Sequence, residues 1–262
     1  MLFKPKRPVD EDEWEWLLAG FKWLERQYPE LAESRRLALP TRDFFPPISA
    51  RGVQLGEQLM AQVKAIGGIG DWPVTLIPVK PPPRGAVNNV AALQHGKGAA
   101  GTFRLVQTDK EGPIAEIRYS VDQLENPAGL VATFAHEISH YLLHMYRTPF
   151  TGGDDVEELF TDLTAVWLGF GIFLGNSARY GHHIDEGAGR GWFVSGWRGY
   201  LSERMLMTAL ALSEMSAGRD PDAASPYLKS YLTSDVRMAQ KYAARRDLRA
   251  EIEEIDLADY GA

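Results

Sequence analysis

The segment TFAHEISHYLLH, residues 133–144, constrains the fold of this chain more than any other stretch. His136 and His140 stand four positions apart, and Glu137 follows the first of them. Positions i and i+4 lie on the same face of an α-helix, so a helix here lets both imidazoles reach one ion. The glutamate then lies where its carboxylate can hold a water molecule bound to that ion. The spacing therefore predicts a helix that carries two metal ligands and a general base.

Composition narrows the kind of metal site. The chain has 262 residues and no cysteine, which excludes thiolate metal sites, iron–sulfur clusters, disulfides and cysteine nucleophiles. Any metal must be held by His, Asp or Glu, and Zn²⁺ is the ion that two histidines with this spacing bind. The formal net charge of −7 speaks against a nucleic-acid partner, because phosphate recognition needs clustered Lys and Arg.

A third histidine cannot complete the site. In one known pattern a glycine and a third histidine continue the motif, but Leu143 and Tyr146 occupy those places. His144 lies about 12 Å along the helix axis from His136, at about 1.5 Å per residue. That separation is too large for one tetrahedral ion to bind His136, His140 and His144 together. We therefore expect His144 to be a surface or supporting residue.

A glutamate from the next helix can supply the third ligand. The segment DDVEELFTD, residues 154–162, offers Glu158 and, one turn later on the same face, Asp162. Glu158 would bind the metal, and Asp162 would hydrogen-bond a ligand imidazole and orient it. The alternative for Glu158 is a solvated helix start, because acidic residues favour the first turn of a helix. Glu157 and Asp155 are then the alternative ligands.

The HEISH segment followed by EELFTD resembles the gluzincin-type zinc metallopeptidases, whose pattern is H-E-x-x-H with a downstream E-x-x-x-D. The resemblance covers roughly residues 114–175. It implies Zn²⁺ held by His136, His140 and Glu158, with Glu137 as general base and Asp162 behind a ligand. In such enzymes a later Tyr, His or Arg steadies the oxyanion, and the candidates here are Tyr180, His182, His183, Arg198 and Tyr200. The segments TDLTAVWLGFGIFLGNSA and GYLSE are also similar to a group of uncharacterised bacterial proteins.

Hydrophobic periodicity predicts helices and a few strands. Helical spacing covers residues 11–28, 51–66, 127–146, 156–174, 202–216 and 226–256, and strand patterns cover 74–79, 102–108 and 114–120. The last two strands are joined by DKEGP and should form a hairpin. Residues 178–199 have no clear period. The apolar run 163–175 is shorter than the roughly 20 residues that a bilayer requires, so we expect a buried core helix and no membrane partner.

These elements predict an α+β, zincin-like fold: a small mixed sheet, an active-site helix, a glutamate-bearing helix packed on it, and further helices at both ends. Residues 1–70 would form an N-terminal helical section and residues 71–262 the zincin-like metallopeptidase domain with its helical C-terminal part, or the two would form one compact domain. The zincin resemblance implies that strand 114–120 is the free sheet edge above the cleft. An extended peptide could add to such an edge through backbone hydrogen bonds.

The predicted function is that of a cytoplasmic zinc-dependent peptidase acting on a peptide or protein substrate. The first twenty residues, MLFKPKRPVDEDEWEWLLAG, lack the apolar core of a signal peptide. A zinc-activated water would attack the peptide bond, with Glu137 as general base. The alternative is a zinc-bound regulatory or interaction protein that keeps the fold and the site with little or no turnover. The presence of Glu137 favours the enzyme.

Overall fold

The structure is a computed structural model that describes residues 6–80, 101–108, 112–145, 154–185, 191–197 and 200–260. It is a mixed α+β protein, mostly helical, with a small three-stranded mixed sheet. The α-helices are α1 (Glu11–Gln27), α2 (Pro29–Ser34), α3 (Val53–Ile66), α4 (Pro127–His144), α5 (Asp154–Ala165), α6 (Gly171–Ala178), α7 (Glu203–Ser216), α8 (Ser230–Ala243) and α9 (Leu248–Glu254). The strands are β1 (Val74–Val79), β2 (Gly101–Thr108), β3 (Gly112–Ser120), β4 (Arg179–Asp185) and β5 (Gly191–Trp197). The short helices are η2 (Val121–Glu125), η3 (Val166–Phe170), η4 (Pro221–Tyr227) and η5 (Leu257–Tyr260).

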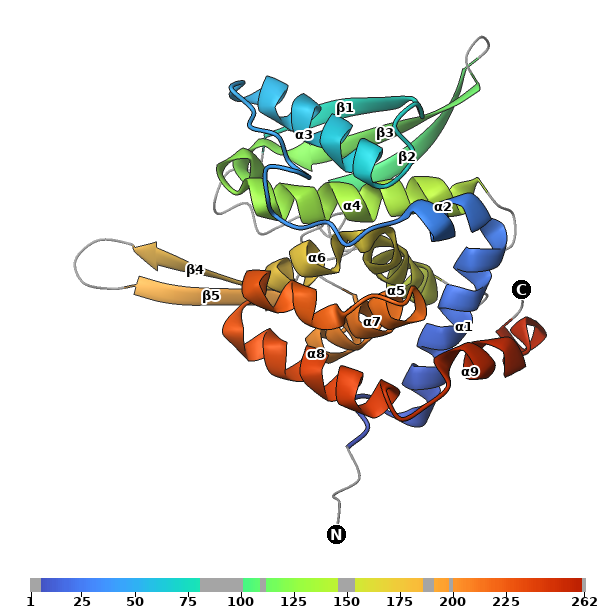
Figure 1. The fold of residues 1–262 in the computed structure, drawn as a ribbon. Coiled ribbons are helices and arrows are strands. Elements are labelled where there is room, and N and C mark those ends of the chain that lie inside the picture. The colour runs from blue at the N-terminus through green and yellow to red at the C-terminus, as the bar shows by residue number, and fades with distance from the viewer. Residues whose placement is uncertain are drawn as a thin grey trace.

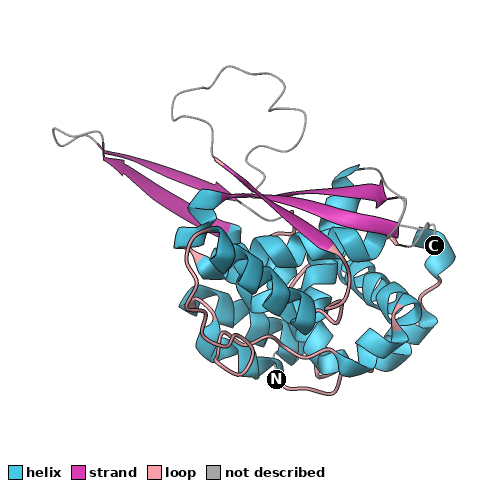
Figure 2. Cartoon of the chain, turned by 90° about the horizontal axis from the view of Figure 1, so that it is seen from above, coloured by secondary structure: helices cyan, strands magenta, loops and turns pink. Residues whose placement is uncertain are grey.

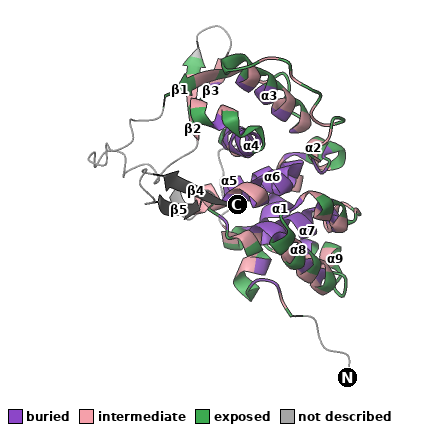
Figure 3. Ribbon diagram, turned by 90° about the vertical axis from the view of Figure 1, so that its left-hand side faces the viewer, coloured by how far each residue is buried: buried purple, intermediate pink, exposed green. Residues whose placement is uncertain are grey.

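Helix α4 lies at the centre of the molecule, between the sheet with α3 on one side and a bundle of helices on the other (Figure 1). The strands gather on one side, and the helices fill the rest (Figure 2). Buried residues run along α1, α4, α5, α6 and α7 (Figure 3). Along α4 every residue from Gly129 to Leu143 is buried except His136. The predicted active-site helix therefore crosses the core, and its one opening toward solvent is at the first histidine.

The sheet has the strand order β1-β3-β2. Strand β3 pairs in parallel with β1 and antiparallel with β2, which confirms the predicted hairpin. The prediction that strand 114–120 is the free edge is wrong, because β3 has a neighbour on both sides and the edge strands are β1 and β2. Alternation along a strand reports which face is buried but not how many strands flank it. For that reason the sequence pattern could not distinguish the centre of this sheet from its edge.

One face of β3 packs on the helices, as its alternation predicts. Ala115, Ile117 and Tyr119 are buried, whereas Arg118 between them is exposed. The Tyr119 ring meets Phe134 of α4 edge to face, with the ring centroids 5.4 Å apart. Such an aromatic contact adds to the burial of apolar area and fixes how a helix lies on a sheet. The sheet thereby sets the position of α4 and of its histidines.

The helix predicted over residues 156–174 is interrupted. Helix α5 passes into the π-helical turn η3 and then α6, and Gly169 between them has φ 103°. Its carbonyl accepts a hydrogen bond from the Ala38 amide at 3.0 Å, and a Cβ at Gly169 would lie 2.0 Å from the Arg36 carbonyl oxygen. Only glycine permits this approach of two backbones. The run Val156–Ala178 is long and apolar enough to cross a membrane by composition, yet 89% of its apolar window is buried in the protein, as for the predicted core helix.

Two other segments also differ from the sequence prediction. Residues 178–199, which have no period, include the antiparallel pair β4 and β5, a hairpin that extends away from the helices (Figure 1). The helix predicted over 226–256 is divided into the end of η4, then α8 and α9. Helix α9 is fastened to α1 by Lys22, whose buried Nζ donates to the carbonyls of Glu253 and Ile255 at 2.8 and 2.5 Å. The last helix therefore belongs to the same core as the first.

Candidate metal centre

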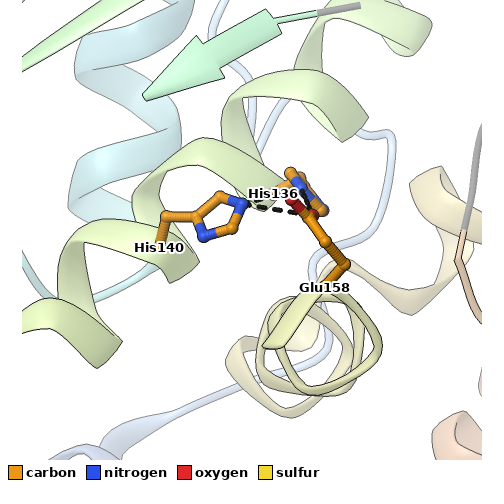
Figure 4. Close-up of side chains that lie close together, drawn as sticks. All are labelled: His136, His140 and Glu158. Atoms are coloured by element: carbon orange, nitrogen blue, oxygen red, sulfur yellow. Dashed lines mark hydrogen bonds and ion pairs between the residues drawn. The ribbon is translucent and has the colours of Figure 1, made fainter. Parts of the chain in front are cut away.

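Three side chains from two helices converge beside the opening in α4. His136 and His140 extend from α4, and Glu158 reaches them from the first turns of α5 (Figure 4). The His136 Nε2 atom lies 3.1 Å from His140 Nε2 and 3.2 Å from Glu158 Oε2, and His140 Nε2 lies 3.3 Å from the same oxygen. The three potential ligand atoms therefore form a nearly equilateral triangle.

The size of this triangle fits a zinc ion. Zinc bonds of about 2.0–2.1 Å in a tetrahedron place neighbouring ligand atoms about 3.3–3.4 Å apart. The edges between His136, His140 and Glu158 are 3.1–3.3 Å, so the three atoms can bind one ion with little movement. The donor set of two imidazoles and one carboxylate is one that Zn²⁺ accepts. The side chains are 18%, 11% and 29% exposed, which leaves the site partly open to solvent.

Asp162 fixes the orientation of His136. Its Oδ1 accepts a hydrogen bond from His136 Nδ1 at 2.9 Å, and its Oδ2 accepts from the backbone amides of Tyr200 and Leu201 at 2.7 and 3.0 Å. The Asp162 side chain is only 4% exposed, so its charge depends on these donors. With its Nδ1 proton held by Asp162, His136 presents Nε2 to the centre of the triangle.

Thr161 has the same role for His140, and no sequence pattern indicates it. The Thr161 hydroxyl donates to the Glu157 carbonyl at 2.8 Å, so its oxygen is left to accept from His140 Nδ1 at 3.3 Å. That contact places the His140 proton on Nδ1 and the free lone pair on Nε2. Threonines in helices commonly bond back to the preceding turn, and a sequence signal for a second partner does not exist.

Glu137 is buried beside the triangle with one oxygen unused. It is 3% exposed, and its Oε2 has no hydrogen-bond partner within the parts of the chain that the structure describes. Burial raises the pKa of Glu137 to about 7, against the opposing effect of the His136 charge. A Cβ at Gly101, where β2 begins, would lie 2.4 Å from Glu137 Oε1. The absence of a side chain at Gly101 therefore leaves room for this carboxylate beneath the edge strand.

Without a metal the triangle is held by a proton. Burial alone would lower the pKa of His136, but the hydrogen bonds with Asp162 and Glu158 and the charges of Asp162 and Glu137 raise it to about 10. Burial acts to raise the pKa of Glu158, and the hydrogen bonds with His136 and His140 bring it down to about 2. A protonated His136 can donate to Asp162 through Nδ1 and to Glu158 through Nε2. A zinc ion would take the place of the Nε2 proton.

Aromatic rings cover both histidines. Phe103 of β2 stacks on His140 with ring centroids 5.9 Å apart and an interplanar angle of 14°. Tyr200 stacks on His136 at 5.8 Å and 18°. Apolar neighbours limit the rotation of ligand imidazoles and the entry of water around them. Phe103 was not singled out in the sequence, because a single aromatic residue in a strand has many structural uses.

The structure brings together the sequence-predicted residues His136, Glu137, His140, Glu158 and Asp162. Of the alternative ligands, Glu157 has its carboxylate on the far side of His140, with Oε1 3.9 Å from Nδ1. The side chain of Asp155 is not among those that the structure describes. Among the oxyanion candidates only Tyr200 is described at the site. The side chains of Tyr180, His182 and His183 and all of Arg198 lie outside the described residues.

Comparison with known proteins supplies no family for this chain. No family model matches the sequence, and searches of curated proteins and of solved structures find no match. The functional argument therefore rests on the geometry of the site.

Proposed function

We propose that this protein is a zinc-dependent peptidase of the gluzincin type, with a zincin-like fold, that hydrolyses peptide bonds in a peptide or protein substrate. The triangle of His136 Nε2, His140 Nε2 and Glu158 Oε2, with edges of 3.1–3.3 Å, is the observation that carries the proposal. Three protein ligands leave the fourth position of a tetrahedral ion open, which is the arrangement of catalytic zinc sites.

Glu137 is suited to move the proton in this reaction. Zinc, when bound, would supply a Lewis acid that polarises the scissile carbonyl and makes water acidic near neutral pH. Glu137 would accept the proton of the attacking water through its unpartnered oxygen and pass it to the leaving amine. In the metal-free site burial raises the pKa of Glu137 to about 7, the direction that makes a carboxylate a better proton acceptor.

The edge strand β2 is the proposed docking site for an extended substrate. Its backbone groups on the side away from β3 have no strand partner in the described sheet. Gly101 of this strand lies against Glu137, and Phe103 lies against His140. A peptide added to β2 would therefore run past the three candidate ligands. Binding of a peptide inhibitor should slow hydrogen exchange at residues 102–108 and leave exchange in β1 unchanged.

Metal content tests the ligand assignment. We expect purified protein dialysed against zinc to retain the ion through His136, His140 and Glu158, and Glu158→Gln to lose it at a free-zinc level that saturates the unchanged chain. Glu254→Gln is the matched control, because it removes an exposed helix glutamate far along the chain. Zinc retention by Glu158→Gln equal to that of the control would refute the assignment.

Turnover of a peptide library tests the reaction. Glu137→Gln keeps the size of the side chain and removes the base, so we expect zinc to be retained and cleavage to be lost. Loss of both in a folded variant would mean that Glu137 is needed for the site itself. A zinc-loaded, folded protein that cleaves no peptide but binds a protein partner would instead favour the regulatory or interaction protein.

A further inference from the structure

A second group of potential ligands lies one turn further along α4. One ligand atom each from His140, His144 and Glu157 lies within 4.8 Å of the other two. The His140 Nδ1 atom, on the opposite side of the ring from the first triangle, is 3.9 Å from Glu157 Oε1. We propose that these three side chains form a second divalent-cation site, weaker than the first, that shares His140 with it.

His144 is prepared as a ligand by its backbone contact. Its Nδ1 donates to the His140 carbonyl at 3.0 Å, because a carbonyl can only accept. The neutral ring therefore carries its proton on Nδ1 and a free lone pair on Nε2. Glu157 is 44% exposed, so its carboxylate can close the distances of up to 4.8 Å around an ion without disturbing the core.

Phe103 holds the two histidines of this group in place. Its ring stacks on His140, and its centroid lies 5.0 Å from that of His144. One aromatic residue of the edge strand thus restricts both rings on the same side of α4. Ordering two ligands in advance reduces the entropy lost when an ion binds. This packing distinguishes the group from two exposed side chains that happen to be near each other.

The shared histidine makes the two sites compete. A neutral imidazole offers a lone pair on only one of its nitrogens. In the structure Thr161 sets the His140 proton on Nδ1, which leaves Nε2 for the first site. An ion in the second site must take the place of the Nδ1 proton, which is released to solvent, so both ions can be bound together only when His140 bridges them as an imidazolate. The second ion therefore binds more weakly than the first.

The second ion would not be a catalytic partner of the first. Two ions on opposite nitrogens of one imidazole are about 6 Å apart, whereas the paired metals of two-metal hydrolases lie roughly 3.5–4 Å apart. The second site would therefore act on the first only through His140. Its existence requires the position of His140 and not the peptidase activity, so the two proposals can fail separately.

Equilibrium dialysis against buffered zinc, with zinc counted per chain, tests the site. We expect a first equivalent at low free zinc and a second only at higher free zinc. His144→Ala and Glu157→Gln should each lose the second equivalent and keep the first. Glu158→Gln should lose the first equivalent, His140→Ala should lose both, and Glu254→Gln should change neither. Circular dichroism and the melting temperature check that each variant is folded.

Three outcomes would overturn the inference. These are a single equivalent in the unchanged chain at all zinc levels, a second equivalent that survives in both His144→Ala and Glu157→Gln, or a second equivalent that survives in folded His140→Ala. A second equivalent that behaves as expected beside a first that Glu158→Gln does not remove would instead overturn the proposed catalytic centre alone.

Discussion

The substitution Asp162→Asn tests how the fold prepares the proposed metal site. The carboxylate meets three donors on two sides: His136 Nδ1 at Oδ1, and the amides of Tyr200 and Leu201 at Oδ2. Asparagine has the same shape but only one accepting oxygen. That oxygen should remain with the two amides, which cannot move without shifting the start of α7. The NH₂ group of the asparagine then faces His136 Nδ1.

The expected cost falls on metal binding. To accept from this NH₂, the His136 ring must carry its proton on Nε2, the atom that points at His140 and Glu158. Zinc could then bind only after the ring gives up the new hydrogen bond, at a cost of about 1–3 kcal/mol. That corresponds to a loss of roughly 5–150-fold in zinc affinity, which includes the roughly 10–100-fold usual for a residue that orients a ligand.

Competition against a zinc-binding dye would measure the affinity of Asp162→Asn. The control is Asp235→Asn, the same isosteric change at a helix aspartate paired with Arg204 and remote from the site. Urea unfolding of both metal-free variants would show whether the native fold is kept. Unchanged zinc affinity in a folded Asp162→Asn variant would refute the claim that the carboxylate sets the His136 tautomer.

Three further predictions follow from single contacts. Thr161→Val removes the acceptor for His140 Nδ1 and should weaken zinc binding by roughly 10-fold. The control is Thr164→Val, which changes a buried threonine of the same helix whose hydroxyl donates to the Phe160 carbonyl, and it should leave zinc affinity unchanged. Equal zinc affinities of the two variants would contradict the role of Thr161. Gly169 has φ 103°, and the Cβ of an alanine there would lie 2.0 Å from a backbone oxygen. Gly169→Ala should therefore lower the free energy of unfolding, measured in urea, by more than about 3 kcal/mol. Gly218→Ala, at φ 71° with open space around it, should cost about 1 kcal/mol, and similar values would contradict the strain at Gly169. Because the pKa of His136 is about 10 without metal, zinc binding at pH 8 should release a proton. An indicator dye in weakly buffered solution would measure this release, and its absence would contradict the raised pKa.

The sequence was sufficient to predict the parts of this site that follow from helical spacing. His136 and His140 had to share a face of α4, and Glu158 and Asp162 had to share a face of α5. The structure brings these faces together, with His136 bonded to both acidic residues. All four residues lie on the two helices that the sequence predicts for them.

Features that depend on contacts distant in the sequence could not be predicted. The alternation in β3 shows which of its faces is buried, but only the parallel partner from residues 74–79 places the strand at the centre of the sheet. The residues around Gly169 predict an uninterrupted helix, whereas in the structure the backbone of residues 36–38 passes against this glycine. In both cases the deciding neighbour lies well outside the window in which a periodic pattern is read.

Within about one turn, helix α5 carries one proposed ligand and two residues that orient the histidines. The ligand pattern alone therefore describes only part of the role of α5. Glu158, Thr161 and Asp162 stand at i, i+3 and i+4, so they share one face toward α4. One would bind the ion, while the other two hold the Nδ1 protons of His140 and His136 respectively. A single rotation of α5 would therefore remove the third ligand and release both histidine tautomers at once. The crossing of α4 and α5 is thus the structural unit on which metal binding would depend, more than any one ligand.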